Sequence, residues 1–156
     1  MPTVREQVFS AVVTALSGIN GASPYQTKVD DVFPYNVTPD ENIADDIVLG
    51  VFPRTFQVQR NQTRLSHGAD CPAIFMVGIR GILKGAADVI EAAHSQFLAD
   101  VERAIWANIN LGINTNAVRI ESLSFENELI SKTGAAALAT FLATLTVAWL
   151  TDPTNP

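Results

Sequence analysis

The sequence predicts an α+β fold, in which a mainly antiparallel or mixed sheet has two amphipathic helices packed across it and ends in a long C-terminal strand. Apolar residues recur at helical spacing in two segments, 3–19 and 86–108. Between and after them lie segments that alternate every second residue or are continuously apolar, as strands do. This order of helix, strands, long helix, strand and long terminal strand is typical of helices layered on one sheet.

Length and charge limit the class of protein. The chain has 156 residues, which fits a single domain spanning 1–156. Its formal charge is −6, so we expect the surface as a whole to repel nucleic acid and anionic lipid. One cysteine, Cys71, excludes an internal disulfide and favours a reducing compartment. The start of the chain lacks the basic region and cleavage site typical of a secretion signal.

The first helix is predicted over Thr3 to Ile19. Thr3 followed by Glu6 is a capping-box pattern, and Gly18 with the turn-forming residues after it ends the segment. Residues 20–46 that follow show no clear period. There we expect a short strand near Thr27 to Phe33 and then a solvated acidic loop.

Six acidic residues in that loop resemble oxygen ligands for a hard cation. Their spacing matches no known cage, so we predict no metal site there; they are Asp30, Asp31, Asp40, Glu41, Asp45 and Asp46.

Two strands are expected next. The chain from Ile47 reads as extended up to Pro53 and then alternates every second residue, which places an edge or a bulge at the proline. A second strand is predicted from Ala73 to about Ile82. It is apolar on both faces over 74–77, so we expect a central strand covered on both sides.

The long helix is predicted over Ala86 to Asn108. His94 falls within its apolar stripe, where a packed core histidine is the expected role. Trp106 lies away from that stripe near the helix end. Either it belongs to a contact patch with another molecule or a loop of the same chain covers it.

The last part of the chain supplies two further strands. One is predicted from Ala117 to about Phe125, with a bulge at Ser122-Leu123, and a long loop follows it. The nineteen residues 133–151 carry no charge, which is the border of what a membrane helix needs. Five threonines and six alanines make this stretch only weakly hydrophobic, and from Phe141 it alternates every second residue. We therefore predict a long strand and no membrane span.

No pattern in the sequence indicates catalysis. We find no phosphate-binding glycine loop, no paired His or Cys ligands and no nucleophile elbow. His67, Cys71 and His94 are the main soft metal ligands, and they do not form a set. We expect no catalytic residue, no cofactor and no metal, and hence a protein that is not an enzyme.

The chain resembles the tail terminator (tail completion) proteins of long-tailed bacteriophages. The likeness covers about two-thirds of the chain. It lies in the opening helix "REQVFSAVVTALSGI", the strand "CPAIFMVGI", the helix "DVIEAAHSQFLADVERAIWAN", the "LG" turn at Leu111-Gly112 and the closing "LTVAWLTDP". Residues 30–70 depart from the pattern of this family.

The resemblance implies a structural virion protein that is assembled in the host cytoplasm. Such proteins form a hexameric ring on the head-proximal end of the tail tube, stop tube polymerisation and join the tail to the head connector. The implied partners are other copies of the chain, the tail tube protein and a connector or neck protein. DNA passes through such a ring without specific binding, which an acidic chain suits.

The sequence also suggests where subunits meet. A long uncharged terminal strand suits sheet contacts between subunits. We expect the interface to include Trp106, Phe141, Leu145, Val147 and Trp149.

Two alternatives to a tail terminator remain. One is another neck or tail-tube component, and the other is a small intracellular ligand-binding domain or enzyme with a ferredoxin-like sheet.

Overall fold

The computed structural model describes residues 2–38, 46–59 and 71–151 and has an α+β fold, as predicted. The elements follow one another along the chain as α1 (Val4–Ser17), β1 (Asp31–Phe33), β2 (Ile47–Val58), β3 (Cys71–Ala86), α2 (Ile90–Trp106), β4 (Arg119–Thr133) and β5 (Ala136–Thr151). The strands form one five-stranded sheet in the order β1-β2-β3-β5-β4. Only the β1–β2 pair is parallel, so the sheet is mixed.

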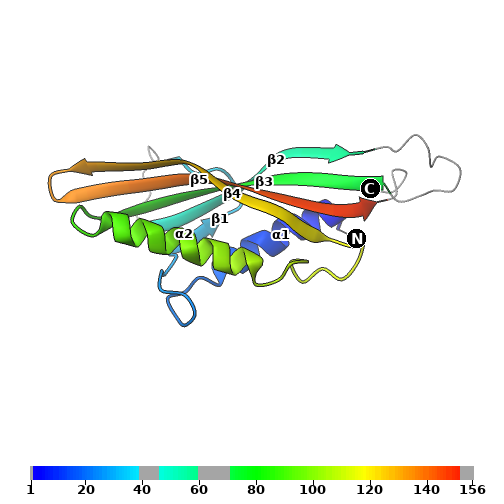
Figure 1. Ribbon diagram of the computed structural model, residues 1–156, viewed down its shortest axis with the longest axis horizontal. Coiled ribbons are helices and arrows are strands. Elements are labelled where there is room, and N and C mark those ends of the chain that lie inside the picture. Colours follow the sequence, from blue (N-terminus) through cyan, green and yellow to red (C-terminus); the bar gives the residue numbers. More distant parts are fainter. Residues whose placement is uncertain (1, 39–45, 60–70, 152–156) are drawn as a thin grey trace, which may run out of the picture.

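Both helices lie on the same face of the sheet (Figure 1). α2 covers the half of the sheet near the tip of the β4–β5 hairpin, and α1 covers the half near the end of β5. The core is the layer between helices and sheet. Its largest fully buried side chains include Leu16 of α1, Phe97 of α2 and, on the sheet, Phe75 and Phe141.

The first helix begins as the sequence predicts. The Thr3 side chain accepts a hydrogen bond from the Glu6 N–H, and the Glu6 carboxylate accepts one from the Thr3 N–H at 2.6 Å. This capping box satisfies N–H groups that have no partner within the helix. The bond from the Thr3 backbone, followed by the one from its hydroxyl, lowers the pKa of Glu6.

The acidic loop contributes structure through one of its members. Asp30 Oδ2 accepts hydrogen bonds from the backbone N–H groups of Asp46 and Ile47, at 3.2 and 3.0 Å, so it holds the start of β2. The expected strand is present but shorter, as β1. Three of the six acidic residues, 40, 41 and 45, lie outside the described part of the chain.

Strand β2 has a register irregularity between Pro53 and Thr55, where the sequence predicts an edge or a bulge. The irregularity and an edge both occur at this point. β1 pairs with residues 48–50, so the second half of β2 lies at the edge of the sheet. β3 is central, as predicted, between β2 and β5. Only part of it is covered on both sides: Ile82 is 1% exposed, but neither helix lies on the second face and Met76 remains 37% exposed there.

Two predicted boundaries are wrong. The long helix begins at Ile90 and not at Ala86, because β3 continues to Ala86, which pairs with Ala136. The loop expected after Phe125 is instead strand, since β4 continues to Thr133 and a two-residue turn at Gly134 joins it to β5. Gly134 has a φ of 64°, which suits the first position of a tight hairpin turn.

Candidate functional site

The four β5 residues predicted at a subunit interface lie in the core of the chain. Phe141, Leu145 and Val147 are fully buried and Trp149 is 3% exposed. They occupy alternate positions of β5 and face the helices. Their burial corrects the expected interface, since these side chains are already covered within one chain and present no surface to a neighbour.

Aromatic packing explains why this face is closed. The ring of Phe141 lies 5.3 Å from Phe97 of α2 and 5.5 Å from Phe125 of β4, in both cases edge to face. The ring of Trp149 stacks on Phe56 at 5.7 Å, and Arg5 of α1 lies over the other end of this cluster, 5.0 Å from the Phe56 ring. Such contacts favour a fixed packing between helices and sheet.

The opposite face of the sheet, here called the open face, carries no helix of the described part of the chain. The even-numbered residues of β3 and β5 point to it, and the strand register brings together Met76, Thr146 and Ser122 in one row and Ile74 and Ala148 in the next. Near β1 this face is covered, because Val37 packs on Val48 and Ile82. Near the end of β5 Met76 is 37% and Leu150 40% exposed.

We call this second region the uncharged patch. It consists of the uncharged open-face residues in this part of the sheet, which are Phe52, Thr55, Gln57, Pro72, Ile74, Met76, Gly78, Ser122, Ser124, Thr144, Thr146, Ala148 and Leu150. An apolar centre with a polar rim is typical of a surface that binds another protein.

Ion pairs border the uncharged patch on two sides. Arg54 donates from Nη1 to Glu126 Oε1 at 3.0 Å and to Thr144 Oγ1 at 2.7 Å, so it reaches from β2 across the sheet to β4. At the other side Arg119 Nε lies 2.7 Å from Glu121 Oε1. Exposed pairs of this kind add little stability, so they act mainly as a charged frame around the patch.

The β4 edge of the sheet is less suited to binding than the face. β4 is an edge strand with register irregularities between Ile120 and Ser122 and between Glu126 and Leu129. Bulges and charged side chains on an edge hinder pairing with a strand of another molecule. Of these two surfaces, the open face is therefore the candidate contact surface.

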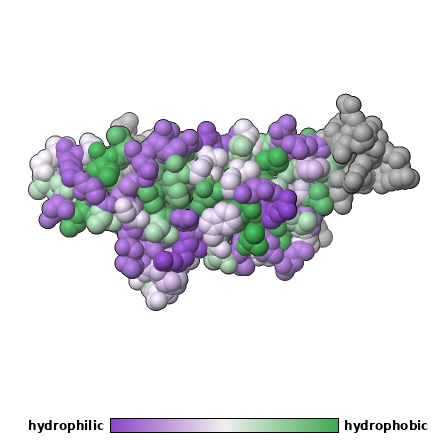
Figure 2. All heavy atoms as spheres, viewed as in Figure 1, coloured by the Kyte–Doolittle hydropathy of each residue, from purple (hydrophilic) through white to green (hydrophobic). Residues whose placement is uncertain are grey.

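Trp106 forms a second exposed apolar region. It is 39% exposed at the end of α2, and Ile109 just beyond it is 63% exposed. In Figure 2 apolar and weakly polar residues gather around this end of α2 and the loop that follows. The sequence left two environments open for Trp106, a contact patch at the surface or cover by a loop of the same chain. Among the described residues Trp106 remains exposed, as the first of these requires.

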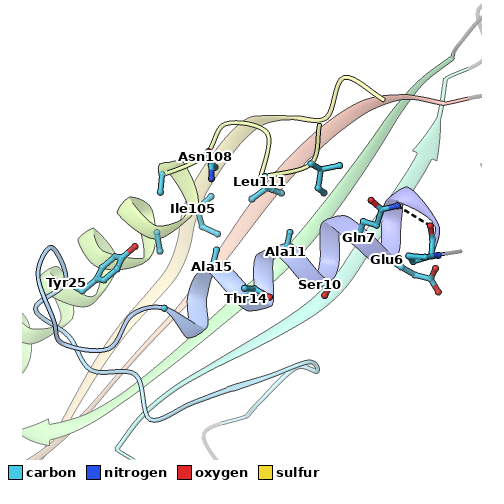
Figure 3. A pocket seen from close by; sticks show the side chains of 16 residues that line it. Glu6, Gln7, Ser10, Ala11, Thr14, Ala15, Tyr25, Ile105, Asn108 and Leu111 are labelled. Atoms are coloured by element: carbon cyan, nitrogen blue, oxygen red, sulfur yellow. Dashed lines mark hydrogen bonds between the residues drawn. The ribbon is translucent and has the colours of Figure 1, made fainter. Parts of the chain in front are cut away.

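A groove of about 690 Å³ separates α1 from the 104–113 segment (Figure 3). Its walls are formed mostly by small side chains, among them Ala11, Ala15 and Ala104. Glu6, at one end, is engaged in the helix cap, and the Gln7 side chain donates to the Pro2 carbonyl at 3.1 Å. The other titratable side chain of its lining, Tyr25, lies at the opposite end of the groove from Glu6 (Figure 3).

The candidate metal ligands lie apart. Cys71 begins β3 and is partly buried, His94 is 5% exposed inside the core, and His67 is outside the described residues. Within the part of the chain that the structure describes, no three His, Cys, Asp or Glu side chains form a cluster that could hold a metal ion.

His94 is the core residue that the sequence predicts, but its environment is unusual. Its ring lies 6.1 Å from Phe141, and among the described residues neither ring nitrogen has a hydrogen-bond partner. Glu128 Oε1 is 3.4 Å from Nε2 without the geometry of a hydrogen bond. Buried donors and acceptors without partners reduce stability.

Asp100 is a structural residue that sequence reasoning missed. Its side chain is fully buried on α2, and Oδ2 accepts hydrogen bonds from the backbone N–H groups of Gln26 and Thr27, at 3.0 and 2.7 Å. Arg103 lies 3.3 Å from Oδ1 and also donates to the Pro24 carbonyl. The sequence did contain a signal for this role, because Asp100 is an acidic residue next to the apolar stripe of the predicted helix.

Comparison with protein-family models and with curated protein sequences gives no match to this chain. Among the described residues, no helix has both the length and the apolar composition needed to cross a membrane.

Proposed function

We propose that this chain is a structural virion protein of the tail-terminator type. In this proposal it forms a hexameric ring at the head-proximal end of a phage tail tube, ends tube polymerisation and joins the tail to the head connector. It acts by assembly and not by catalysis. The ring is built in the host cytoplasm and becomes part of the tail or neck of the virion.

The observation that carries the self-association is the uncharged patch on the open face. An open sheet face that bears an uncharged patch with exposed Met76 and Leu150 is a surface that another molecule is able to cover. The identity of the assembly rests on the resemblance of the sequence to tail terminators. The α+β architecture that the residue pattern predicts, helices packed across a sheet with a long closing strand, is present.

The proposed partners are the tail tube protein on one side of the ring and a connector or neck protein on the other. DNA passes through the ring without specific binding. The acidic balance of the chain, −6, supports this part of the proposal, because a net negative surface does not retain phosphates. Another neck or tube component would share these properties.

The groove in Figure 3 favours a second candidate, a ligand-binding domain. Its volume of about 690 Å³ is in the range of small-molecule pockets, about 300–1,000 Å³. Six of its sixteen lining residues have polar side chains, but Glu6 is held in the helix cap and Gln7 on the Pro2 carbonyl, so we rank this candidate below assembly.

The test is the mass of the purified chain at 1–50 µM, measured by native mass spectrometry and by light scattering after size exclusion. The proposal expects a closed species of about six chains, seen as a ring by negative-stain electron microscopy. Added to polymerising tube subunits, that species should shorten the tubes. A chain that stays monomeric at about 50 µM contradicts the ring and leaves the ligand-binding candidate.

A further inference from the structure

Asn20 differs from the other asparagines of the chain because it alone precedes a glycine. The pair Asn20–Gly21 lies where the chain turns after α1, and both residues are exposed. In Figure 1 the loop that follows α1, in blue, projects from the helices away from the sheet. Water and hydroxide therefore reach this pair in the folded protein.

The turn has a defined shape although it is exposed. Asn20 forms an antiparallel bridge with Lys28, and next to it the Val29 N–H donates to the Ile19 carbonyl at 2.9 Å. Gly21 has a φ of 78°, a conformation that glycine adopts without strain. The fold thus determines how the Asn20 side chain lies relative to the backbone that follows it.

The Asn20 carboxamide is held against that backbone. Its Oδ1 accepts a hydrogen bond from the Ala22 N–H at 3.0 Å, which closes a turn that contains both Cγ of Asn20 and the Gly21 nitrogen. The same bond polarises the carboxamide, and its donor points at the oxygen that becomes negative when a nucleophile adds to Cγ. A donor already in place at a developing oxyanion lowers the barrier to addition.

We propose that Asn20 is a site of spontaneous deamidation in which the Gly21 backbone is the nucleophile. A hydroxide ion takes the proton of the Gly21 N–H, and the nitrogen adds to Cγ of Asn20. The negative charge passes to Oδ1, where the Ala22 N–H stabilises it. The bond between Cγ and Nδ2 then breaks, and Nδ2 takes a proton from water and leaves as ammonia. A cyclic imide remains, and the hydroxide ion is regenerated.

Water opens the imide in two ways. Addition at the former Cγ gives an aspartate, whose carboxylate still accepts from the Ala22 N–H in a stronger, charge-assisted bond. Addition at the backbone carbonyl carbon of residue 20 gives an isoaspartate, in which the main chain runs through the former side chain and is one carbon longer. The longer chain no longer fits the bridge to Lys28. Either product consumes one water, releases one ammonia and adds one negative charge.

Asn110 is a matched control within the same chain. Its Oδ1 accepts a hydrogen bond from the Gly112 N–H at 2.9 Å, so its side chain makes the same turn. The residue that follows it is Leu111, whose side chain hinders the approach of its own nitrogen to Cγ of Asn110. Because small misplacements of reacting atoms cost large factors in rate, we expect Asn20 to convert at least about tenfold faster than Asn110.

The test incubates the folded, unmodified chain in mildly alkaline buffer and follows each asparagine by peptide mapping with mass spectrometry. Digestion at acidic pH prevents conversion during the analysis. We expect aspartate and isoaspartate at residue 20, an equal amount of released ammonia, and a rate that rises with the hydroxide concentration. Asn20→Gln, whose side chain would have to close a larger ring, should release at least about tenfold less ammonia.

Leu111→Gly tests the cause at the second turn. Leu111 has a φ of 55°, so glycine suits the backbone there. Asn110 should convert at least about tenfold faster in this variant than in the unmodified chain. Circular dichroism checks that the variants remain folded, and the comparison of Asn20 with Asn110 in the unmodified chain needs no variant.

The outcomes are distinct. Conversion at residue 20 of the folded chain with Asn110 unchanged supports the inference. An Asn20 that keeps its amide in the folded chain overturns it, and conversion there after unfolding in guanidinium would show that the fold blocks the reaction. Equal rates at Asn20 and Asn110 overturn the role of Gly21 and with it the inference. None of these results depends on whether the chain forms a ring, so the proposed function is tested separately.

Discussion

Three glycines of β3 allow the packing of the two sheet faces to be measured separately. Gly81 lies opposite Phe141 in the strand register, and the Phe141 ring occupies the space that a Cβ at 81 would need. Gly78 lies opposite Phe52, whose ring fills the corresponding space on the open face. At Gly85 a Cβ would make only an ordinary contact, 3.5 Å from the nearest Ile90 atom.

The expected sizes follow from these contacts. Alanine is favoured over glycine in a strand by about 0.5–1 kcal/mol, so Gly85→Ala should raise the free energy of unfolding by about that amount. Gly81→Ala gains the same stabilisation from the lower backbone entropy of the unfolded chain. It also overpacks a core in which Phe141 is fully buried, which lowers the free energy of unfolding by about 1–3 kcal/mol. We expect its net loss to be about 1–2 kcal/mol. Gly78→Ala should fall between them, because the half-buried Phe52 ring is able to turn toward solvent.

Urea unfolding followed by circular dichroism is the assay, with all three variants measured at the same low protein concentration so that any association between copies does not add to stability. The urea concentrations at the midpoint of unfolding are compared only between variants whose unfolding free energy falls with urea at the same slope. A changed slope would mean that the unfolded or native state itself had changed. If Gly81→Ala unfolds at the same urea concentration as Gly85→Ala, the Phe141 ring is free to move and the closed face is not packed as described.

Four further predictions concern single side chains. Asp100→Ala leaves the backbone N–H groups of Gln26 and Thr27 unpaired and should lower the free energy of unfolding by about 2–4 kcal/mol. The control Glu102→Ala, exposed on the same helix, should change it by less than about 0.5 kcal/mol. Equal effects of the two substitutions would contradict the structural role of Asp100. His94→Leu removes a buried ring without hydrogen bonds and should raise the melting temperature, whereas a large decrease would indicate an unseen partner. Val147→Pro interrupts β5 between its two neighbours and should abolish soluble expression; a soluble, folded variant would refute the strand. Because folding lowers the pKa of Glu6, its ionised carboxylate contributes stability that is fully present above pH 4.5 and is lost as the pH falls through the folded-state pKa. The stability difference between the natural chain and Glu6→Gln should therefore vanish in acid. A difference that stays constant with pH would contradict the cap.

The sequence predicted best those elements whose signal is local. The helix cap at Thr3 and the period of β5 depend on residues close together in the chain, and both are present. The irregularity at Pro53 was also predictable, because a proline removes a hydrogen-bond donor from the strand in which it lies.

Errors arose where long-range pairing overrides a weak local pattern. β4 continues past Phe125 although the alternation there is interrupted, because Asn127 takes a φ of 54° at an irregularity and the strand then resumes beside β5. A bulge shifts the phase of the side chains, so the continuing strand reads as a loop. The start of α2 was misplaced for a related reason, since pairing with β5 holds Ala86 in β3.

The two faces of β5 show most clearly what each level determines. By itself the sequence determined that this segment is a long uncharged strand, with larger side chains on one face and smaller, more polar ones on the other. Only the tertiary structure decided that α1 and α2 of the same chain cover the larger face, and that Met76 and Leu150 therefore lie on the exposed one. The alternation of a strand separates two faces, but which of them becomes buried depends on where distant helices pack, and no local pattern contains that information.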